Sequence, residues 1–155
     1  MKRKIFLATT IFSGIFFITR CNTSPNSDNE VREINPVRDT LSADKGMGRF
    51  KEVPLTHPLN DTDVIEGQAI YKAKCFSCHK LTTEKLIGPG LHGVTDRRTP
   101  EWIMNFMTNT SVMIDSDAIA QQLMVTCNAR MPNQNLTDDD ARDMLEFLRK
   151  NDGKN

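Results

Sequence analysis

The sequence has no excess of charge of either sign and no long apolar run, and these absences exclude several classes of protein. Lysine and arginine total 20, as do aspartate and glutamate, so nothing in the composition favours nucleic acid as a partner. The most apolar run, IFLATTIFSGIFFI, has 14 residues, whereas a membrane-spanning helix needs about 20. There is no internal repeat and no sustained alternation of apolar and polar residues. We therefore expect one mainly helical domain.

Residues 1–21 have the pattern of a secretory signal. The basic start MKRK precedes the apolar run, which ends near Cys21 and is followed by the polar stretch NTSPNSDNE. This arrangement resembles a bacterial lipoprotein signal, in which the cysteine becomes the lipidated first residue. Arg20 stands where such signals have a small residue, so ordinary cleavage and an uncleaved anchor are the alternatives. The resemblance implies export to the periplasmic side of a bacterial membrane, with a lipid anchor on Cys21.

The remainder divides into a linker, an extension and a helical domain. Residues 22–43 are polar and lack apolar periodicity, which predicts a flexible linker. Residues 44–60 mix glycine, proline and isolated apolar residues, which predicts an N-terminal extension packed on the domain. Helical signals begin near residue 61, so the domain spans 61–155. Cleavage before Cys21 leaves 16 basic and 20 acidic residues, a formal charge of −4.

Four helices are predicted within that domain. Asp63, with Glu66 three residues later, suggests a capping box at the start of the first helix. Thr99-Pro100 supplies an N-cap and a proline at the first helical position of the second. The third is expected from Asp115 to about Val125. The last follows Thr137, with three aspartates in its first turn and Gly153 near its end.

The stretch CFSCH, from Cys75 to His79, has three possible meanings: a zinc half-site, a dithiol redox pair or a haem-attachment site. A structural zinc site usually needs two ligand pairs, and the remaining cysteine and histidines have no such spacing. A dithiol pair would follow a strand, whereas a helical pattern precedes Cys75. Covalent haem fits better, because two thiols three positions apart can add to two vinyl groups and place His79 beneath the iron.

Beyond this motif, residues 61–150 resemble the class I cytochromes c. The first helix has the family's glycine and aromatic residue at Gly67 and Tyr71. In the family this helix crosses the last one, and Leu145 and Leu148 are the expected opposing residues. The loop Gly88–Gly93 reads GPGLHG. By resemblance, the Pro89 carbonyl accepts the Nδ1 hydrogen of His79 and leaves Nε2 for the iron.

The resemblance also implies a methionine ligand in the loop before the last helix. Met131-Pro132 lies in that position, in a polar loop where a core role explains little. Met124 is the runner-up, and ligation by His92 is a remoter alternative. The other methionines at helical spacing are expected to fill the core.

Three further residues are assigned by the same comparison or by composition. Trp102 is expected to pack on the haem and to donate to a propionate, although an ordinary core role is equally consistent. Arg98 is expected to neutralise a propionate. Cys127 is expected to be a small buried apolar residue rather than a reactive thiol. The lysines that flank CFSCH (Lys72, Lys74, Lys80 and Lys85) could form a basic collar that steers an acidic partner.

The runs RRTPEWIMNF (97–106), MPNQNLT (131–137) and GRFKEV (48–53) resemble a smaller group of monohaem respiratory cytochromes c. These often occur beside alternative complex III, terminal oxidases or nitrous oxide reductase. The resemblance implies a monomeric electron carrier, not an enzyme, with one haem c bound through Cys75 and Cys78 and iron ligated by His79 and Met131. Its partners would be a terminal oxidase, a reductase or a quinol-oxidising complex. The alternatives are a five-coordinate haem protein that binds gas or peroxide and a dithiol oxidoreductase.

Overall fold

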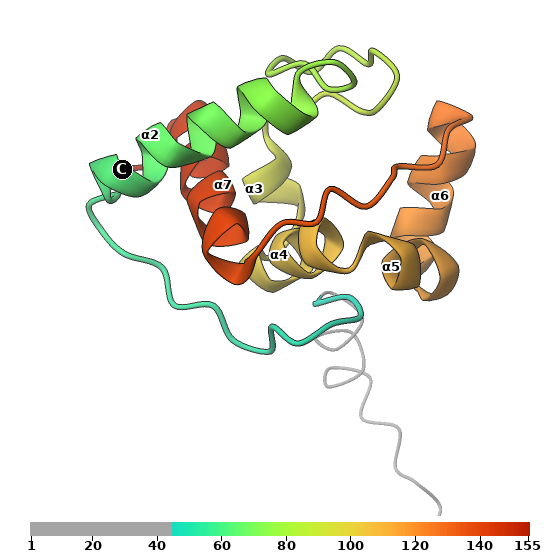
Figure 1. Ribbon diagram of the computed structural model, residues 1–155, viewed down its shortest axis with the longest axis horizontal. Helices are drawn as coiled ribbons and strands as arrows, with labels where there is room; N and C mark the ends of the chain where they lie inside the picture. The colour runs from blue at the N-terminus through green and yellow to red at the C-terminus, as the bar shows by residue number, and fades with distance from the viewer. Residues whose placement is uncertain (1–44) are drawn as a thin grey trace, which may run out of the picture. The chain divides into compact units, whose positions relative to one another are not determined.

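The computed structural model describes residues 45–155, so the predicted signal (1–21) and linker (22–43) lie outside the described residues. Helices account for the regular structure of this part, and no strand occurs in it. The elements are α2 (Asp61–Ile70), the π-helical turn η1 (Tyr71–Cys75), α3 (Val94–Arg97), α4 (Pro100–Thr108), α5 (Thr110–Ser116), α6 (Ala118–Cys127) and α7 (Asp138–Asn151) (Figure 1). The prediction of a mainly helical domain is confirmed.

None of the helices between residues 45 and 155 combines the length and the apolar character needed to cross a membrane.

The first and last helices of the domain, α2 and α7, pack against each other (Figure 1), and Gly67 lies at their contact. A Cβ atom at this position would overlap the backbone carbonyl of Asp143 and the side chain of Phe147, so only glycine permits this close approach. The predicted opposing residues, Leu145 and Leu148, are wrong. Asp143 and Phe147 are four residues apart and share the stripe of α7 that faces α2, whereas the two leucines are buried on the neighbouring stripe.

Two helix starts match their sequence signals because the signals are purely local. Thr99 accepts a hydrogen bond from the Trp102 N–H at the start of α4. Thr137 caps α7 and forms a reciprocal capping box with Asp140. Gly153 follows α7 with a φ of 75°, a conformation that favours glycine.

Two other predicted helix starts are wrong. The first helix begins after Asn60, whose side chain accepts from the Thr62 N–H, so Asp63 lies within the helix. The third helix, predicted from Asp115 to about Val125, corresponds to α6, which begins later, at Ala118, because the chain is extended at Asp117, which caps α6 by accepting from the Ala120 N–H. The preceding helix α5 (Thr110–Ser116) was not predicted. In both places several polar residues could serve as a cap, and packing selects one of them.

Residues 45–60 are irregular and contact α4 and α7. The fully buried side chain of Asn105 donates to the carbonyls of Lys45 (3.0 Å) and Phe50 (2.9 Å) and accepts from the Phe50 N–H (3.0 Å). Farther along, Arg142 donates to the Pro54 carbonyl (2.7 Å). The segment thus satisfies its backbone through side chains of the helices instead of a sheet or helix of its own.

Candidate functional site

The CFSCH stretch begins in a π turn at the end of α2. The Phe76 N–H donates to the Tyr71 carbonyl (2.9 Å), and the His79 N–H donates to the Cys75 carbonyl (2.9 Å). Such turns insert an extra residue and re-aim the side chains that follow, and they occur often at functional sites. Cys75, Cys78 and His79 all line one cleft.

The His79 ring is held from two directions. Its Nδ1 lies 2.9 Å from the Pro89 carbonyl oxygen, so the predicted hydrogen bond is present. That acceptor requires a hydrogen on Nδ1 and leaves Nε2 with its lone pair. Gly88 lies against the ring, and a Cβ atom there would overlap it. The Tyr71 hydroxyl, in turn, donates to the His79 carbonyl (2.7 Å).

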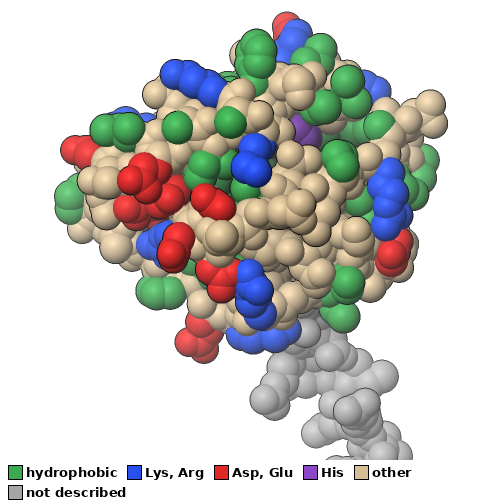
Figure 2. Space-filling view, in the orientation of Figure 1, with side chains coloured by type: hydrophobic (Ala, Val, Ile, Leu, Met, Phe, Trp, Pro, Cys, Tyr) green, Lys and Arg blue, Asp and Glu red, His purple; other side chains and the backbone are tan. Residues whose placement is uncertain are grey.

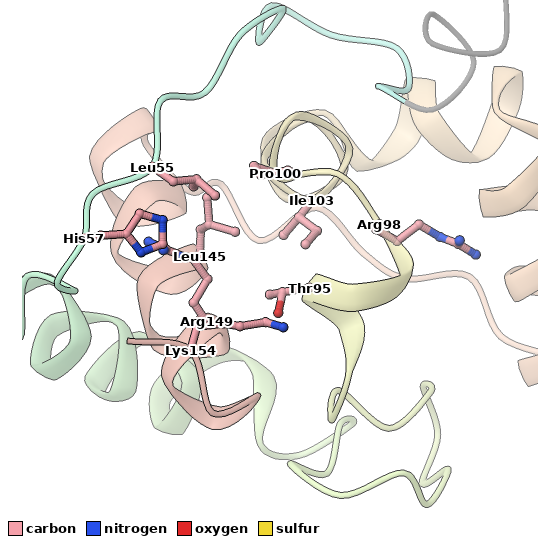
Figure 3. A pocket seen from close by; sticks show the side chains of 9 residues that line it. All are labelled: Leu55, His57, Thr95, Arg98, Pro100, Ile103, Leu145, Arg149 and Lys154. Carbon is pink, nitrogen blue, oxygen red and sulfur yellow. The ribbon is translucent and has the colours of Figure 1, made fainter. Parts of the chain in front are cut away.

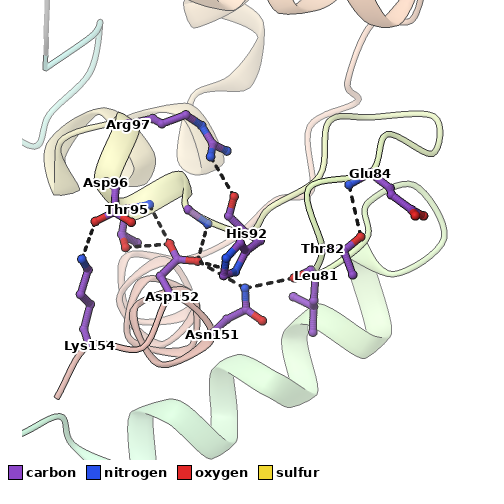
Figure 4. A network of polar contacts seen from close by, with 11 residues as sticks. Leu81, Thr82, Glu84, His92, Thr95, Asp96, Arg97, Asn151, Asp152 and Lys154 are labelled. Carbon is purple, nitrogen blue, oxygen red and sulfur yellow. Dashed lines mark hydrogen bonds and ion pairs between the residues drawn. The ribbon is translucent and has the colours of Figure 1, made fainter.

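The loop that carries Pro89 is fixed at both ends. On one side the Gly88 N–H donates to the Cys78 carbonyl (2.8 Å). On the other, the buried carboxylate of Asp152 accepts from the Gly93 N–H (2.6 Å) and from the Thr95 N–H (2.9 Å) and hydroxyl (2.7 Å) (Figure 4). Burial raises the pKa of Asp152, but the hydrogen bonds from Thr95 and Gly93 outweigh it and leave the pKa lowered.

His92 belongs to this polar network and is not part of the cleft lining. Its carbonyl accepts from Arg97 (2.8 Å), and its Nδ1 lies 3.7 Å from the Asp152 carboxylate (Figure 4).

The cleft is deep, open at its mouth and mainly apolar. Its cavity volume is about 310 Å³. No carboxylate lines it, and its charged lining residues are Lys74 and Arg130. Apolar residues from α3, α4, α5, α6 and α7 form the walls: Val94, Ile103, Phe106, Ile114, Ala120, Leu123, Met144 and Leu148. An apolar cleft bordered by cations suits a flat apolar ligand with acidic substituents.

Met131 also lines this cleft, from the loop between α6 and α7. It is half-buried and packs against the core. Met124 lines the cleft as well, so location alone does not rank the two. Met104 and Met113 fill the core, as predicted, whereas Met107 and Met144 are buried and also reach the cleft.

Trp102 and Arg98 occupy different places. Trp102 is buried, lines the cleft and stacks on Phe106 with 5.0 Å between ring centroids. Its Nε1–H is buried and has no hydrogen-bond partner within the described residues. Arg98 lines a separate small pocket, in which its side chain points away from the others (Figure 3). Its guanidinium lies 5.4 Å from the Trp102 ring centroid, and its role towards a propionate stays a prediction.

The thiols of Cys75 and Cys78 are free. Burial, opposed by Lys74 and reinforced by Cys78, raises the pKa of Cys75 to about 11. The Cys75 thiol is therefore protonated at neutral pH. This is opposite to the low thiol pKa that a dithiol oxidoreductase needs, and a helix rather than a strand precedes the pair.

Cys127 lies at the end of α6, half-buried, and lines the same cleft. The prediction of a small buried apolar residue is therefore wrong in its surroundings: Cys127 is half-buried and faces the cleft, just before the left-handed C-cap Asn128. Between residues 45 and 155, no group of three or more potential metal ligands of the His, Cys, Asp and Glu types comes together. A structural zinc site is therefore not formed in this part of the chain.

Comparison with known proteins identifies the fold. The family model for cytochrome c matches residues 64–152. The chain belongs to the cytochrome c family. The structure of a cytochrome c from Rhodothermus marinus superposes with a TM-score of 0.68 at 33% identity, over 74% of this chain and 97% of that one. The class I fold predicted from the sequence is thus confirmed.

Two further relatives were found. An engineered form of the Rhodothermus marinus cytochrome c, bound to a carbene intermediate, superposes with a TM-score of 0.65 at 33% identity, over 75% of this chain and 98% of that one. A cytochrome c-553-like protein from Synechocystis sp. is 40% identical over 43 residues, which are 28% of this chain and 41% of that protein.

The cytochrome c family is one of haem c electron carriers, and the residues of this chain fit one covalent haem c. Cys75 and Cys78 have the spacing for its two thioether bonds. The imidazole of His79 and the thioether of Met131 line the same cleft, and imidazole and thioether are both groups that can ligate a haem iron. The buried, unpartnered N–H of Trp102 is the kind of donor that an acidic haem substituent would satisfy.

Proposed function

We propose that this cytochrome c carries single electrons between redox proteins, with His79 and Met131 as axial ligands. The observation that carries the proposal is that Cys75, Cys78, His79 and Met131, from distant segments, line one cleft. When bound, haem c supplies a one-electron iron couple.

The side chains around the cleft prepare it for that role. The Pro89 carbonyl, 2.9 Å from His79 Nδ1, keeps the hydrogen on Nδ1 and directs Nε2 into the cleft. Met131 contributes a soft thioether, which favours the ferrous state. The apolar walls act in the same direction, because an added positive charge is disfavoured in an apolar environment. The buried N–H of Trp102, which has no partner in the described residues, would donate to a propionate of the haem.

With both His79 and Met131 on the iron, no position would remain for a substrate, so we propose an electron carrier and not an enzyme. The signal-like residues 1–21 support a periplasmic location. Respiratory partners are supported by the resemblance of the runs at 97–106, 131–137 and 48–53 to respiratory monohaem cytochromes c. A lipid on Cys21 would hold the domain near a terminal oxidase, a reductase or a quinol-oxidising complex. Labelled palmitate should enter the full chain but not its Cys21→Ser variant.

The ligand assignment is tested by absorption spectra of the holoprotein, made with the cytochrome c maturation machinery. Ferric protein should show the weak near-infrared band of methionine–iron ligation. The band should vanish in Met131→Ala and persist in Met124→Ala, which is the matched control because Met124 lines the same cleft. Absence of the band in the wild type would instead favour a five-coordinate haem that binds gas or peroxide.

A further inference from the structure

The segment that presents Met131 has few backbone ties to the rest of the domain. Within the described residues, no backbone-to-backbone hydrogen bond joins residues 130–136 to another segment. Asn133 and Gln134 hydrogen-bond only inside the loop through their side chains: Asn133 accepts from the Asn135 N–H, and Gln134 donates to the Pro132 carbonyl. Before Met131, the loop is tied through Arg130, which pairs with Asp115 (2.8 Å).

After Met131, the polar tie to another element is supplied by Lys74. Its Nζ donates to the Gln134 carbonyl oxygen at 3.1 Å, across 60 positions of sequence. Lys74 immediately precedes Cys75, the first residue of the haem-attachment motif, and both belong to η1. Lys74, Gln134 and Met131 all line the cleft. This hydrogen bond therefore joins the attachment helix to the methionine loop at the cleft itself.

A second lysine repeats the arrangement at the other end of the same region. Lys85, from the loop after His79, donates to the Thr126 carbonyl oxygen at 3.2 Å. Thr126 is in the last turn of α6, where free carbonyls carry the negative end of the helix dipole. An ammonium group thus meets an acceptor that favours positive charge.

We propose that Lys74 and Lys85 are two latches that hold the Met131 loop closed over the cleft. The proposal rests on the proposed ligation by Met131. Each latch joins the part of the chain around the attachment motif to a backbone carbonyl near Met131. Lys74 binds the carbonyl three residues after Met131, and Lys85 binds the carbonyl five residues before it. Neither lysine touches the iron site; both are positioning residues that lower the population of states in which the thioether has left.

The latches are exposed, so each has a modest effect. When a latch is broken, water satisfies the carbonyl, and only the net advantage of the charge-assisted bond is lost. We expect the open population to rise about three- to tenfold for loss of Lys74. The rise should be smaller for Lys85, because α6 is also held by its own helical hydrogen bonds.

The test is the rate at which imidazole binds the ferric holoprotein, followed by stopped-flow absorbance. Imidazole replaces the methionine sulfur on the iron without any change in oxidation state, so the rate reports the opening of the loop. Lys74→Met keeps the aliphatic stem and removes the donor. The matched control is Lys72→Met, which removes the same charge from an exposed lysine that makes no hydrogen bond or ion pair in the described structure.

Imidazole should bind Lys74→Met about three- to tenfold faster than wild type, and Lys72→Met at the wild-type rate. Lys74→Arg, which can donate to the same carbonyl, should restore a rate near that of wild type. Equal rates for the Lys74→Met and Lys72→Met variants, with the near-infrared band intact, would overturn the latch alone. A wild-type protein without that band would overturn both the ligation and the latch.

Discussion

Replacing Asp143 by asparagine should stabilise the protein at neutral pH. Asp143 is half-buried where α7 crosses α2, and Glu66, Asp63 and Asp140 surround it. Figure 2 shows acidic side chains gathered on the face formed by these helices. Burial, and then repulsion from Glu66 and Asp63, raises the pKa of Asp143 to about 6. The Asp143 carboxylate, at the close crossing of α2 and α7, therefore destabilises the folded protein when it is ionised.

The magnitude follows from the difference between folded and unfolded pKa values. A rise from about 3.9 in the unfolded chain to about 6 corresponds to roughly 3 kcal/mol if it were fully expressed. Solvent screens a partly exposed carboxylate, which reduces the expected penalty to about 1 kcal/mol.

The sign is fixed by proton binding. Between about pH 4 and pH 6 the folded chain holds more protons at Asp143 than the unfolded chain does. Its contribution to stability therefore falls as pH rises through this window and stays low above pH 6. The Asp143→Asn variant lacks this dependence.

Urea unfolding of the holoprotein, followed by circular dichroism at several pH values, measures the effect. The free energy of unfolding of Asp143→Asn should exceed that of wild type by about 1 kcal/mol at pH 7 and by little at pH 4. Glu52→Gln removes the same charge from an exposed position, and its free energy of unfolding should equal that of wild type at both pH 4 and pH 7. A stability gain of equal size at pH 4 and pH 7, or a loss at pH 7, would refute the reasoning.

Two further substitutions test the packing that positions the site. Gly67→Ala should destabilise the folded protein by about 1–3 kcal/mol, because the new methyl group overlaps the backbone of α7. Gln68→Ala, on the exposed side of α2, should leave the stability unchanged. Equal thermal melting temperatures for the two variants would contradict the close crossing. Asn105→Ala should cost about 2–4 kcal/mol through three lost hydrogen bonds to residues 45–50 and should speed proteolysis of that segment. Asn109→Ala, which loses one bond of 3.3 Å to the same segment, is the control, and a similar proteolysis rate for both would contradict the role of Asn105.

Much of the candidate site could be predicted from local signals in the sequence. The CFSCH motif is contiguous, so its two thiols and imidazole are brought together by a single helical turn. The Pro89 hydrogen bond spans only ten residues. Thr99 and Thr137 cap their helices through side chains that bond within three positions.

Features that depend on distant partners were not predictable in the same way. Asn60 rather than Asp63 starts α2, and α6 begins only after Asp117; each cap bonds locally, but the packing of the helices selected it from several polar residues nearby. The pattern of apolar residues showed that Leu145 and Leu148 are buried, but it did not show which stripe of α7 faces Gly67. Cys127 has no sequence signal that separates a core thiol from one that lines the cleft.

The sequence by itself determined the haem-attachment chemistry, the helical class and the proline that orients His79, because each depends on residues within a few turns of one another. Only the tertiary structure decided which residues oppose Gly67 and how the Met131 loop is tied to the attachment helix. Those features depend on contacts between segments far apart in the chain, such as the bond from Lys74 to Gln134. A backbone carbonyl is present at every residue, so no residue pattern marks the one that Lys74 binds.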